Sequence, residues 1–365
     1  MLIAIDAITL NLSQKTGVEW YAYYLIKQLI KIPSKNKFIL YSSSKLNLDL
    51  PANWENKVLS WPCQYFWSQL RLSLEMIREK PDVLFVPVRA LPFFCTPKKS
   101  VFTIHDLGYE VFPEAYSFWQ RNYTRFVYQF AAKKACKIFV PSEFTKRELV
   151  RLCQTDPQKI VVTPLGYNKE IFNTNKDKEK NEEVLKKYGI KKPYLFYLGR
   201  KEKKKNVLGL IKAFKILQNK LDKTIYLVLA GRAGTGYEEI KKEILQTKNI
   251  KEISYIEIKD LPSLYQEAEI FIFPSFYEGF GLPLLEAMAS GCPVIASRVG
   301  SLPEIGEEAV VYFDPHNIFE IAETIKRVLS DEKLKESLRK RGLLRINDFS
   351  WEQCAKKTME TLEGL

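Results

Sequence analysis

The chain of 365 residues is 46% hydrophobic and 27% charged, which fits a folded protein large enough for two hydrophobic cores. No apolar run approaches the roughly 20 residues that span a bilayer, and residues 1–10 lack a basic leader, so we expect a cytoplasmic protein. The net charge of +13 is uneven, because residues 1–168 carry 22 Lys and Arg against 13 Asp and Glu. A basic first half can attract nucleic acid, anionic lipid or a phosphorylated acceptor.

Cysteine and histidine are too scattered to build a metal site. The chain has six cysteines without a Cys-x-x-Cys pair, and two histidines, His105 and His316. We therefore expect reduced cysteines, no bound metal and no resident cofactor. The cysteines are Cys63, Cys95, Cys136, Cys153, Cys292 and Cys354.

Short apolar runs alternate with longer segments of helical period. In the first half the expected strands are 2–5, 38–41, 83–86, 101–104 and 137–140, with helices that include 19–32 and 120–135. After a polar, lysine-rich stretch at 173–187, the expected strands are 194–198, 225–230, 253–257, 270–273, 293–296 and 309–313. Repeated strand–helix alternation predicts an α/β protein with doubly wound parallel sheets.

The polar break predicts two domains, residues 1–168 and residues 169–349, with a hinge near 166–173. The amphipathic segment 351–362 follows a turn at 348–350. It is expected either to cap the second domain or to cross back to the first.

The strongest local pattern is a strand, a glycine-bearing turn and a helix within residues 270–290. The helix is expected at 283–290, with Glu286 in its first turn and Glu278 at the mouth of the preceding loop. Backbone N–H groups at a helix N-terminus bind anions, and carboxylates accept hydrogen bonds from vicinal hydroxyls. The plainer alternative is that Glu286 stabilises the helix N-terminus and Glu278 is solvated.

A second pattern follows the strand at 194–198, where Gly199-Arg200 runs into a lysine-rich segment that ends at Lys205-Asn206. Open α/β sheets bind ligands where their strands end, and Arg200 and Lys205 can clamp a diphosphate there. The run of charges does not distinguish Lys205 from Lys204, and a solvated lysine run is the plainer alternative.

Two weaker patterns lie in the first half. His105 and Asp106 follow an apolar strand, so they can face a cleft at the sheet edge, or His105 can be a structural hydrogen-bonding residue. Gly17 and Val18 lie between the first strand and the first helix, where an ordinary loop is the alternative.

A basic, aromatic segment at 118–137 contains five Lys and Arg residues and no acidic residue. Such a helix can lie on an anionic membrane surface. A helix with one core face and one solvated basic face is the alternative.

Taken in this order, the segments resemble glycosyltransferase family 4, the large group of retaining GT-B enzymes, over nearly the whole chain. The Glu278-x7-Glu286 segment, with Gly-Phe-Gly-Leu-Pro inside it, is similar to the family's signature. The stretches TGVEWYAYYL, TIHDLGYEVFPE and PSEFTKREL are most similar to the mannosyltransferase-like branch.

The resemblance implies two Rossmann-like domains facing a central cleft. The first would bind the acceptor, the second would bind the nucleotide sugar, and a closing helix at about 350–365 would cross back to the first. Glu286 would bind the ribose, Glu278 the sugar hydroxyls, and Arg200 and Lys205 the diphosphate. The remaining implied positions are the backbone of Gly279, Phe280, Gly281 and Leu282 along the sugar and phosphate, Gly17 and Val18 near the diphosphate, His105 beside the transferred sugar with Asp106 in the substrate site, and the base near Ile258 and Leu261.

One segment departs from the mannosyltransferase-like branch, which usually reads Glu-Pro-Arg-Lys-Asn where this chain has Glu202-Lys203-Lys204-Lys205-Asn206. Arg200 and Lys205 still fit the broader Gly-Arg-x4-Lys pattern. The departure therefore supports their role but weakens an inference about the donor. Cations and helix-end N–H groups suffice to stabilise a leaving diphosphate, so the resemblance implies a metal-independent, retaining transfer without a protein nucleophile.

The expected reaction transfers a hexose, with mannose from GDP-mannose as the first choice. The acceptor is expected to be a glycan or lipid-linked glycan in cell-surface polysaccharide or glycolipid synthesis, bound by loops such as 46–57 and 90–98. The protein is expected to contact the inner face of an anionic membrane peripherally. Alternatives are a UDP-sugar donor, a nucleotide-sugar epimerase, and a degenerate nucleotide- or nucleic-acid-binding protein. No nucleic-acid-binding motif is recognisable, so we expect no nucleic-acid partner.

Overall fold

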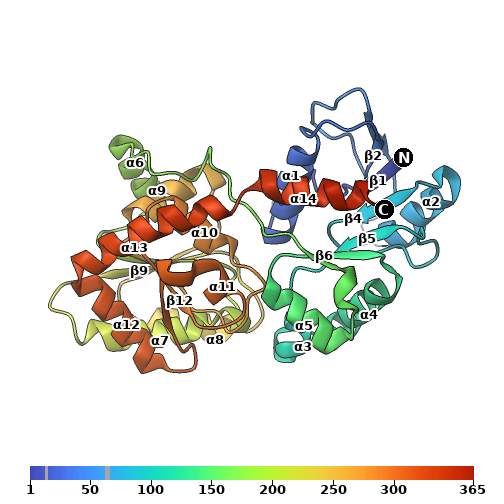
Figure 1. Cartoon of the computed structure of the whole chain (residues 1–365). Helices are drawn as coiled ribbons and strands as arrows, with labels where there is room; N and C mark the ends of the chain where they lie inside the picture. The colour runs from blue at the N-terminus through green and yellow to red at the C-terminus, as the bar shows by residue number, and fades with distance from the viewer. Residues whose placement is uncertain (13–14, 62–65) are drawn as a thin grey trace. The chain divides into compact units, whose positions relative to one another are not determined.

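The computed structural model describes residues 1–12, 15–61 and 66–365, which fold into two units (Figure 1). Unit 1 contains Met1–Glu110, Phe118–Gly166 and Ser350–Leu365, and unit 2 contains Val111–Ser117 and Tyr167–Phe349. The chain therefore passes between the units four times. This division differs from the predicted one at Val111–Ser117, which was placed in the first domain and packs instead with unit 2.

Unit 1 is built on a parallel sheet of seven strands in the order β3-β2-β1-β4-β5-β6-β7. The chain order reverses between β1 and β4, which pair directly with each other. Its strands are β1 (Leu2–Asp6), β2 (Lys37–Ser42), β3 (Trp54–Val58), β4 (Val83–Val86), β5 (Ser100–Thr103), β6 (Lys137–Val140) and β7 (Ile160–Val162). Its helices are α1 (Gly17–Leu29), α2 (Ser73–Glu79), α3 (Gly108–Val111), α4 (Phe118–Lys134), α5 (Glu143–Cys153) and α14 (Trp351–Glu363).

Unit 2 repeats this plan with six parallel strands in the order β10-β9-β8-β11-β12-β13, and the reversal falls between β8 and β11. Its strands are β8 (Tyr194–Leu198), β9 (Tyr226–Ala230), β10 (Ile250–Ile253), β11 (Ile270–Phe273), β12 (Val294–Ser297) and β13 (Val310–Phe313). Its helices are α6 (Lys178–Tyr188), α7 (Val207–Gln218), α8 (Tyr237–Gln246), α9 (Leu261–Glu267), α10 (Leu282–Ala289), α11 (Leu302–Gly306), α12 (Ile318–Ser330) and α13 (Glu332–Arg345). Both sheets thus have the doubly wound, Rossmann-like strand order, which binds ligands where the order reverses.

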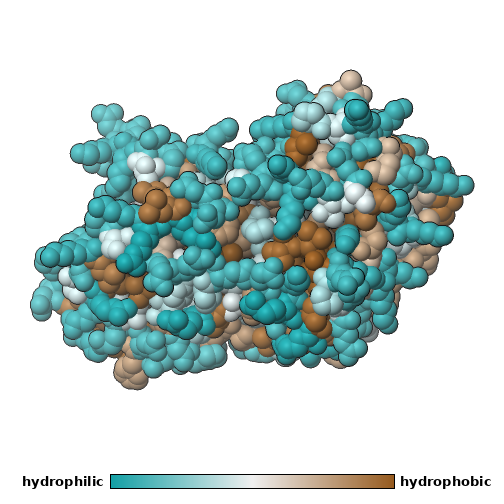
Figure 2. All heavy atoms as spheres, viewed as in Figure 1, coloured by the Kyte–Doolittle hydropathy of each residue, from teal (hydrophilic) through white to brown (hydrophobic). Residues whose placement is uncertain are grey.

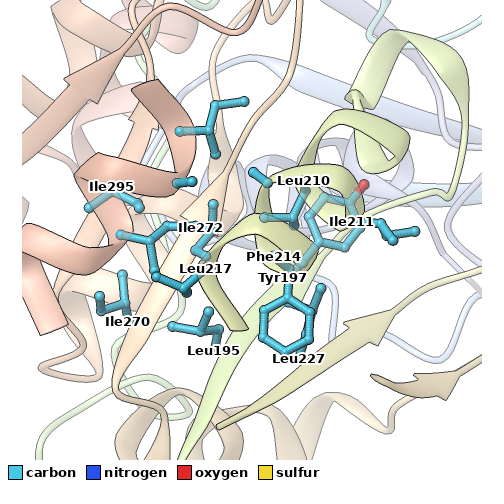
Figure 3. Close-up of a cluster of buried hydrophobic side chains, with 14 of the residues drawn as sticks. Leu195, Tyr197, Leu210, Ile211, Phe214, Leu217, Leu227, Ile270, Ile272 and Ile295 are labelled. Atoms are coloured by element: carbon cyan, nitrogen blue, oxygen red, sulfur yellow. The ribbon is translucent and has the colours of Figure 1, made fainter. Parts of the chain in front are cut away.

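Strand side chains alternate between two buried faces, as expected for a parallel sheet covered by helices on both sides. In unit 2, Leu195 and Tyr197 of β8 pack with Ile270 and Ile272 of β11 against α7 and α12 (Figure 3). On the opposite face, Phe196 and Phe271 contact the ring of Tyr265 from α9, with centroids 5.2 Å apart in each pair. These layers hold the carboxyl ends of β8 and β11 beside each other.

The last helix, α14, belongs to unit 1, where it packs on α1. The indole of Trp351 stacks on Tyr24 of α1, with centroids 5.6 Å apart and an interplanar angle of 26°. Ser350 caps the helix by accepting a hydrogen bond from the backbone N–H of Gln353.

The predicted strands agree with the observed ones within one residue at each end, apart from 253–257. That prediction is wrong, because β10 occupies Ile250–Ile253 and the chain then turns. Two strands were not predicted, namely β3, which overlaps the end of the predicted loop 46–57, and β7. Since β3 is an edge strand with polar residues at 55–57, it shows no apolar run.

The polar stretch 173–187 contains helix α6, which was not predicted. Asp177 caps its start and Gly189, at φ 63°, ends it. Only three of its residues are buried, and one of them is polar, so the helix presents a narrow apolar stripe. Asp177 and Gly189 are typical helix-capping residues, but the many lysines between them led to the prediction of a polar break.

Candidate active site

The central feature of unit 2 is an ion pair at the point where the strand order reverses. Lys205 follows β8, and Glu278 follows β11, the neighbouring strand. The Lys205 Nζ lies 2.6 Å from Glu278 Oε1, and the hydroxyl of Ser275 donates to the same oxygen at 2.6 Å. Glu278 is only 8% exposed. The alternative of a solvated Glu278 is therefore wrong.

The lysine-rich segment is not a solvated run. Lys201 is buried and pairs with Glu252 at 2.6 Å, and Lys204 is buried with its Nζ 3.4 Å from the Tyr116 hydroxyl. Lys205 ends the short 3-10 helix formed by the lysines at 203–205, and its side chain reaches Glu278. The fold thus makes the distinction between Lys204 and Lys205 that composition left open.

Arg200 takes a different position from Lys205. Its side chain is 60% exposed, and its Nε lies 3.5 Å from Glu202. It borders an open hollow of about 750 Å3 whose other wall includes Ala233 and Thr235. The guanidinium is therefore accessible to an anion from solution.

The turn after β12 packs against the loop that carries Glu278 and donates hydrogen bonds to it. Gly300, at φ 61°, lies so close that an added Cβ would be 2.4 Å from the Glu278 carbonyl oxygen. The Ser301 hydroxyl donates to the carbonyls of Glu278, at 3.2 Å, and Phe280, at 2.9 Å. Gly300 and Ser301 were not predicted, because their contacts are to a loop that follows another strand, and Ser275 was not predicted, because its contact with Glu278 depends on how their shared loop folds.

Glu286 was expected in the first turn of its helix, which is wrong. Helix α10 begins at Leu282, directly after Gly281 at φ 109°, so Glu286 lies in the second turn. It therefore does not cap the N-terminus. Burial raises the pKa of the Glu286 carboxyl to about 7, although the Tyr265 hydroxyl donates to it at 3.2 Å and opposes the rise.

The other predicted residues of this loop contribute mainly backbone. The Phe280 ring is buried against Phe349, with centroids 5.9 Å apart, so its side chain belongs to the core. Gly279 and Gly281 carry no side chain, and Leu282 starts α10. The backbone N–H groups at this helix start remain the parts that can face a ligand.

Ile258 and Leu261 flank the next helix start, α9. Between them Asp260 is buried and accepts hydrogen bonds from Lys187 Nζ, at 2.7 Å, and the Tyr188 hydroxyl, at 2.9 Å. Helix α6, which was not predicted, thereby fixes this segment.

In unit 1, His105 lies just beyond β5. Its Nε2 donates to the Pro87 carbonyl at 3.1 Å, and its ring meets Tyr21 edge-on at 4.6 Å. Burial lowers the pKa of His105, which favours the neutral imidazole. The neighbouring Asp106 accepts a hydrogen bond from the Gly108 N–H at 2.8 Å.

Gly17 and Val18 form the first turn of α1 and are not an ordinary loop. Thr16 caps this helix together with Glu19, whose carboxylate accepts the Thr16 N–H at 2.8 Å. Among the described residues, a Cβ added at Gly17 would meet nothing within 4 Å.

Asp6 is a candidate site residue that sequence analysis did not propose. It ends β1, where the strand order of unit 1 reverses, and it is buried. One carboxylate oxygen accepts the Ile8 N–H at 3.0 Å, while within the described residues the other has no hydrogen-bond partner. Burial raises the pKa of the Asp6 carboxyl to about 7. An aspartate that ends an apolar strand was the available signal.

Helix α4 combines exposed aromatic side chains with basic ones. Phe118 and Trp119 are 73% and 80% exposed, and Tyr123 and Phe126 are also exposed. Figure 2 shows hydrophobic residues reaching the surface of unit 1 among hydrophilic ones. The basic character is weaker than the sequence suggested, because Glu110 of α3 pairs with Arg121 and Arg125.

Within the described part of the chain, no group of three or more His, Cys, Asp and Glu side chains is placed to hold a metal ion. None of the helices in that part is both long and apolar enough to span a bilayer. The described cysteines are free thiols, and Cys63 lies outside the described residues.

Comparison with solved structures shows that this is the GT-B fold of glycosyltransferases. The chain aligns with Alr3699/HepE from Anabaena with a TM-score of 0.78 and 16% identity, covering 100% of both chains. It aligns with sucrose-phosphate synthase from Thermosynechococcus elongatus with a TM-score of 0.77 and 20% identity, covering 100% of this chain and 98% of that one.

Sequence comparison identifies the family. The model for glycosyltransferase family 4 matches residues 15–171, and the model for glycosyl transferases group 1 matches residues 177–345. O-antigen chain mannosyltransferase B from Escherichia coli is 32% identical over 273 residues, covering 73% of this chain and 71% of that protein. The serotype-specific mannosyltransferase WbdA from Escherichia coli is 26% identical over 278 residues, 74% of this chain but only 34% of WbdA. The chain belongs to glycosyltransferase family 4 and is a glycosyltransferase.

Proposed function

We propose that the protein transfers mannose from GDP-mannose, with retention of configuration, to a glycan or lipid-linked glycan in cell-surface polysaccharide or glycolipid synthesis. The names of its relatives support the sugar, since the two Escherichia coli proteins are mannosyltransferases and one acts on an O-antigen chain. A UDP-sugar is the alternative donor, because HepE was solved in complex with UDP and glucose.

The observation that carries the proposal is the Lys205–Glu278 pair at the reversal of the second sheet. A cation and a carboxylate in contact suit a ligand that carries both phosphate and hydroxyl groups. Lys205 and the accessible Arg200 would neutralise the diphosphate, and Glu278 would accept hydrogen bonds from the sugar. Glu286 would accept hydrogen bonds from the ribose, and His105 would bind a sugar hydroxyl.

These groups support a transfer that needs neither a metal nor a protein nucleophile. The bond from the anomeric carbon to the diphosphate oxygen breaks, and the bond to the acceptor oxygen forms on the same face. The acceptor proton passes to the departing phosphate oxygen. Lys205, Arg200 and the N–H groups at the start of α10 stabilise the charge that grows on this leaving group. We expect EDTA to leave the rate unchanged.

We also propose that α4 brings the enzyme to the inner face of an anionic membrane. Its exposed Phe118, Trp119, Tyr123 and Phe126 can enter the interface between headgroups and acyl chains, while Lys133 and Lys134 near its end add charge. A lipid-linked acceptor would be met at such a surface.

The proposed function is tested by calorimetric titration with GDP, UDP and ADP, followed by their mannose and glucose conjugates. We expect GDP and GDP-mannose to bind, and Glu286→Ala to abolish binding. Glu336→Ala is the matched control, because the Glu336 side chain is 54% exposed in the same unit. Selective binding of UDP would identify a UDP-sugar as the donor in place of GDP-mannose. Binding of no nucleotide would overturn the proposal.

A further inference from the structure

Seven residues from the first half of the sequence, Val111–Ser117, fold as part of unit 2. We call them the strap. They begin within the TIHDLGYEVFPE stretch that carries part of the family resemblance, and they connect the residues of α3 to α4. None of the site residues predicted from the sequence lies in the strap, so this part of the stretch has no assigned role.

The first contact of the strap is an aromatic stack. The Phe112 ring lies on the Phe276 ring, with centroids 5.7 Å apart and an angle of 14°. His316 stacks with the same Phe276 ring at 4.8 Å and 24°. Phe276 stands two residues before Glu278, and its N–H donates to the Lys204 carbonyl at 2.9 Å. The stack therefore fixes the backbone on both sides of the Lys205–Glu278 pair.

The second contact joins the strap to the lysine-rich segment by polar groups. The Thr235 hydroxyl donates to the Ala115 carbonyl at 3.0 Å, and the Thr235 carbonyl accepts the Lys203 N–H at 3.0 Å. The buried Lys204 places its Nζ 3.4 Å from the Tyr116 hydroxyl. Both loops that supply the ion pair are thus in contact with the strap.

The strap borders a pocket and is not part of the hydrophobic core of unit 2. A pocket of about 440 Å3 separates Phe112 and Glu114 from residues of α7, α8 and α12, and neither residue belongs to the buried cluster drawn in Figure 3. Shortening Phe112 would widen an open pocket and would not create a closed cavity. Its cost to stability should therefore be smaller than that of a core truncation.

We propose that Phe112 is a positioning residue for the transfer reaction, acting through Phe276 on the Lys205–Glu278 pair. This inference rests on the proposed function. Phe112 does not itself contact the ion pair. When its ring is lost, the loop that carries Glu278 gains freedom, and a displacement of about 1 Å in such a group lowers rates by up to about 100-fold.

The test compares Phe112→Ala, Phe112→Tyr and Phe319→Ala, the last being a control because Phe319 is 68% exposed on α12 of the same unit. The rate is the release of GDP from GDP-mannose, with methyl α-mannoside or water as the acceptor. If titration selects another nucleotide, its sugar is used instead. Phe112→Ala should lower kcat about 10- to 100-fold while the Kd for the nucleotide diphosphate stays within about threefold of wild type. Phe112→Tyr should restore kcat, and Phe319→Ala should leave it unchanged.

Two further measurements separate positioning from folding. Thr235→Val removes one hydrogen bond of the strap without touching the aromatic stack, and it should lower kcat in the same direction by a smaller factor. Phe112→Ala in a Lys205→Ala background should lower kcat no further, because it acts through that pair. Wild-type kcat in Phe112→Ala, or no rescue by tyrosine, would overturn the inference. If the wild-type protein binds no nucleotide, that result would instead contradict the proposed function.

Discussion

Lys205 and Glu278 are joined by an ion pair of 2.6 Å, and Ser275 donates to the carboxylate oxygen that Lys205 contacts. Both side chains are largely withdrawn from solvent, at 18% and 10% exposure. In the proposed donor complex the diphosphate competes with Glu278 for Lys205. We therefore expect substitutions of Lys205 and Glu278 to have separable effects on transfer.

Lys205→Ala should lower kcat for GDP release about 100-fold, because a preorganised cation is lost from the charge that develops on the leaving phosphate. Lys205→Arg should recover part of this loss. Lys203→Ala is the matched control, since Lys203 is exposed two residues away on the same short helix. Equal kcat values for Lys205→Ala and Lys203→Ala would show that Lys205 does not serve the leaving group.

The affinity for GDP-mannose should rise with pH through about 7. Burial raises the pKa of Glu286 to about 7, and the ionised carboxylate accepts hydrogen bonds from the ribose hydroxyls more strongly than the neutral acid does. We expect binding about tenfold tighter at pH 8 than at pH 6, measured by calorimetry. GDP-mannose is used because its diphosphate does not titrate in this range. In Glu286→Gln the affinity should be weak and independent of pH, so a variant that keeps the wild-type profile would refute the assignment.

Asp6→Asn should stabilise unit 1 more at pH 8 than at pH 5. Folding raises the pKa of Asp6 from 3.8 to about 7, so between these values the folded state binds more protons than the unfolded state. The contribution of the protonated Asp6 carboxyl to the free energy of unfolding is fully present below pH 4 and is lost as pH rises through 7. Urea unfolding at both pH values measures the difference between the variant and the wild type. Asn keeps the shape of the side chain, so a difference that does not change with pH would contradict the buried, protonated carboxyl.

Removing the aromatic side chains of α4 should release the protein from anionic vesicles. Trp119→Ala with Phe118→Ala deletes two rings that are 80% and 73% exposed and contact each other, so the fold should persist. Cosedimentation with vesicles of phosphatidylglycerol and phosphatidylethanolamine should fall at least about tenfold, whereas Leu245→Ala, on an exposed residue of unit 2, should bind like wild type. Binding that survives in the double variant but disappears at high salt would assign the attachment to charge alone.

The sequence was sufficient to identify features that depend on neighbours along the chain. Apolar runs separated by helical periods predicted ten of the described strands within one residue at each end, whereas 253–257 was wrong and β3 and β7 were not predicted. The spacing of Glu278 and Glu286 and the Gly199-Arg200 turn pointed to two loops that follow neighbouring strands, β11 and β8, because parallel strands present their ends at one edge. The predicted roles of Arg200, Glu286 and His105 remain predictions that the binding and rate measurements test.

Only the tertiary structure decided which residues meet. Lys205 pairs with Glu278, and Asp6 ends β1 at the point where the strand order of its sheet reverses. Phe112 stacks on Phe276, which lies in the other half of the sequence. None of these relations can be read from local period or capping. The first two arise because the doubly wound order brings β8 beside β11 and β1 beside β4, so burial and pairing at these edges depend on strands distant in sequence. The third arises because Val111–Ser117 folds with unit 2, although it lies in the first half of the sequence.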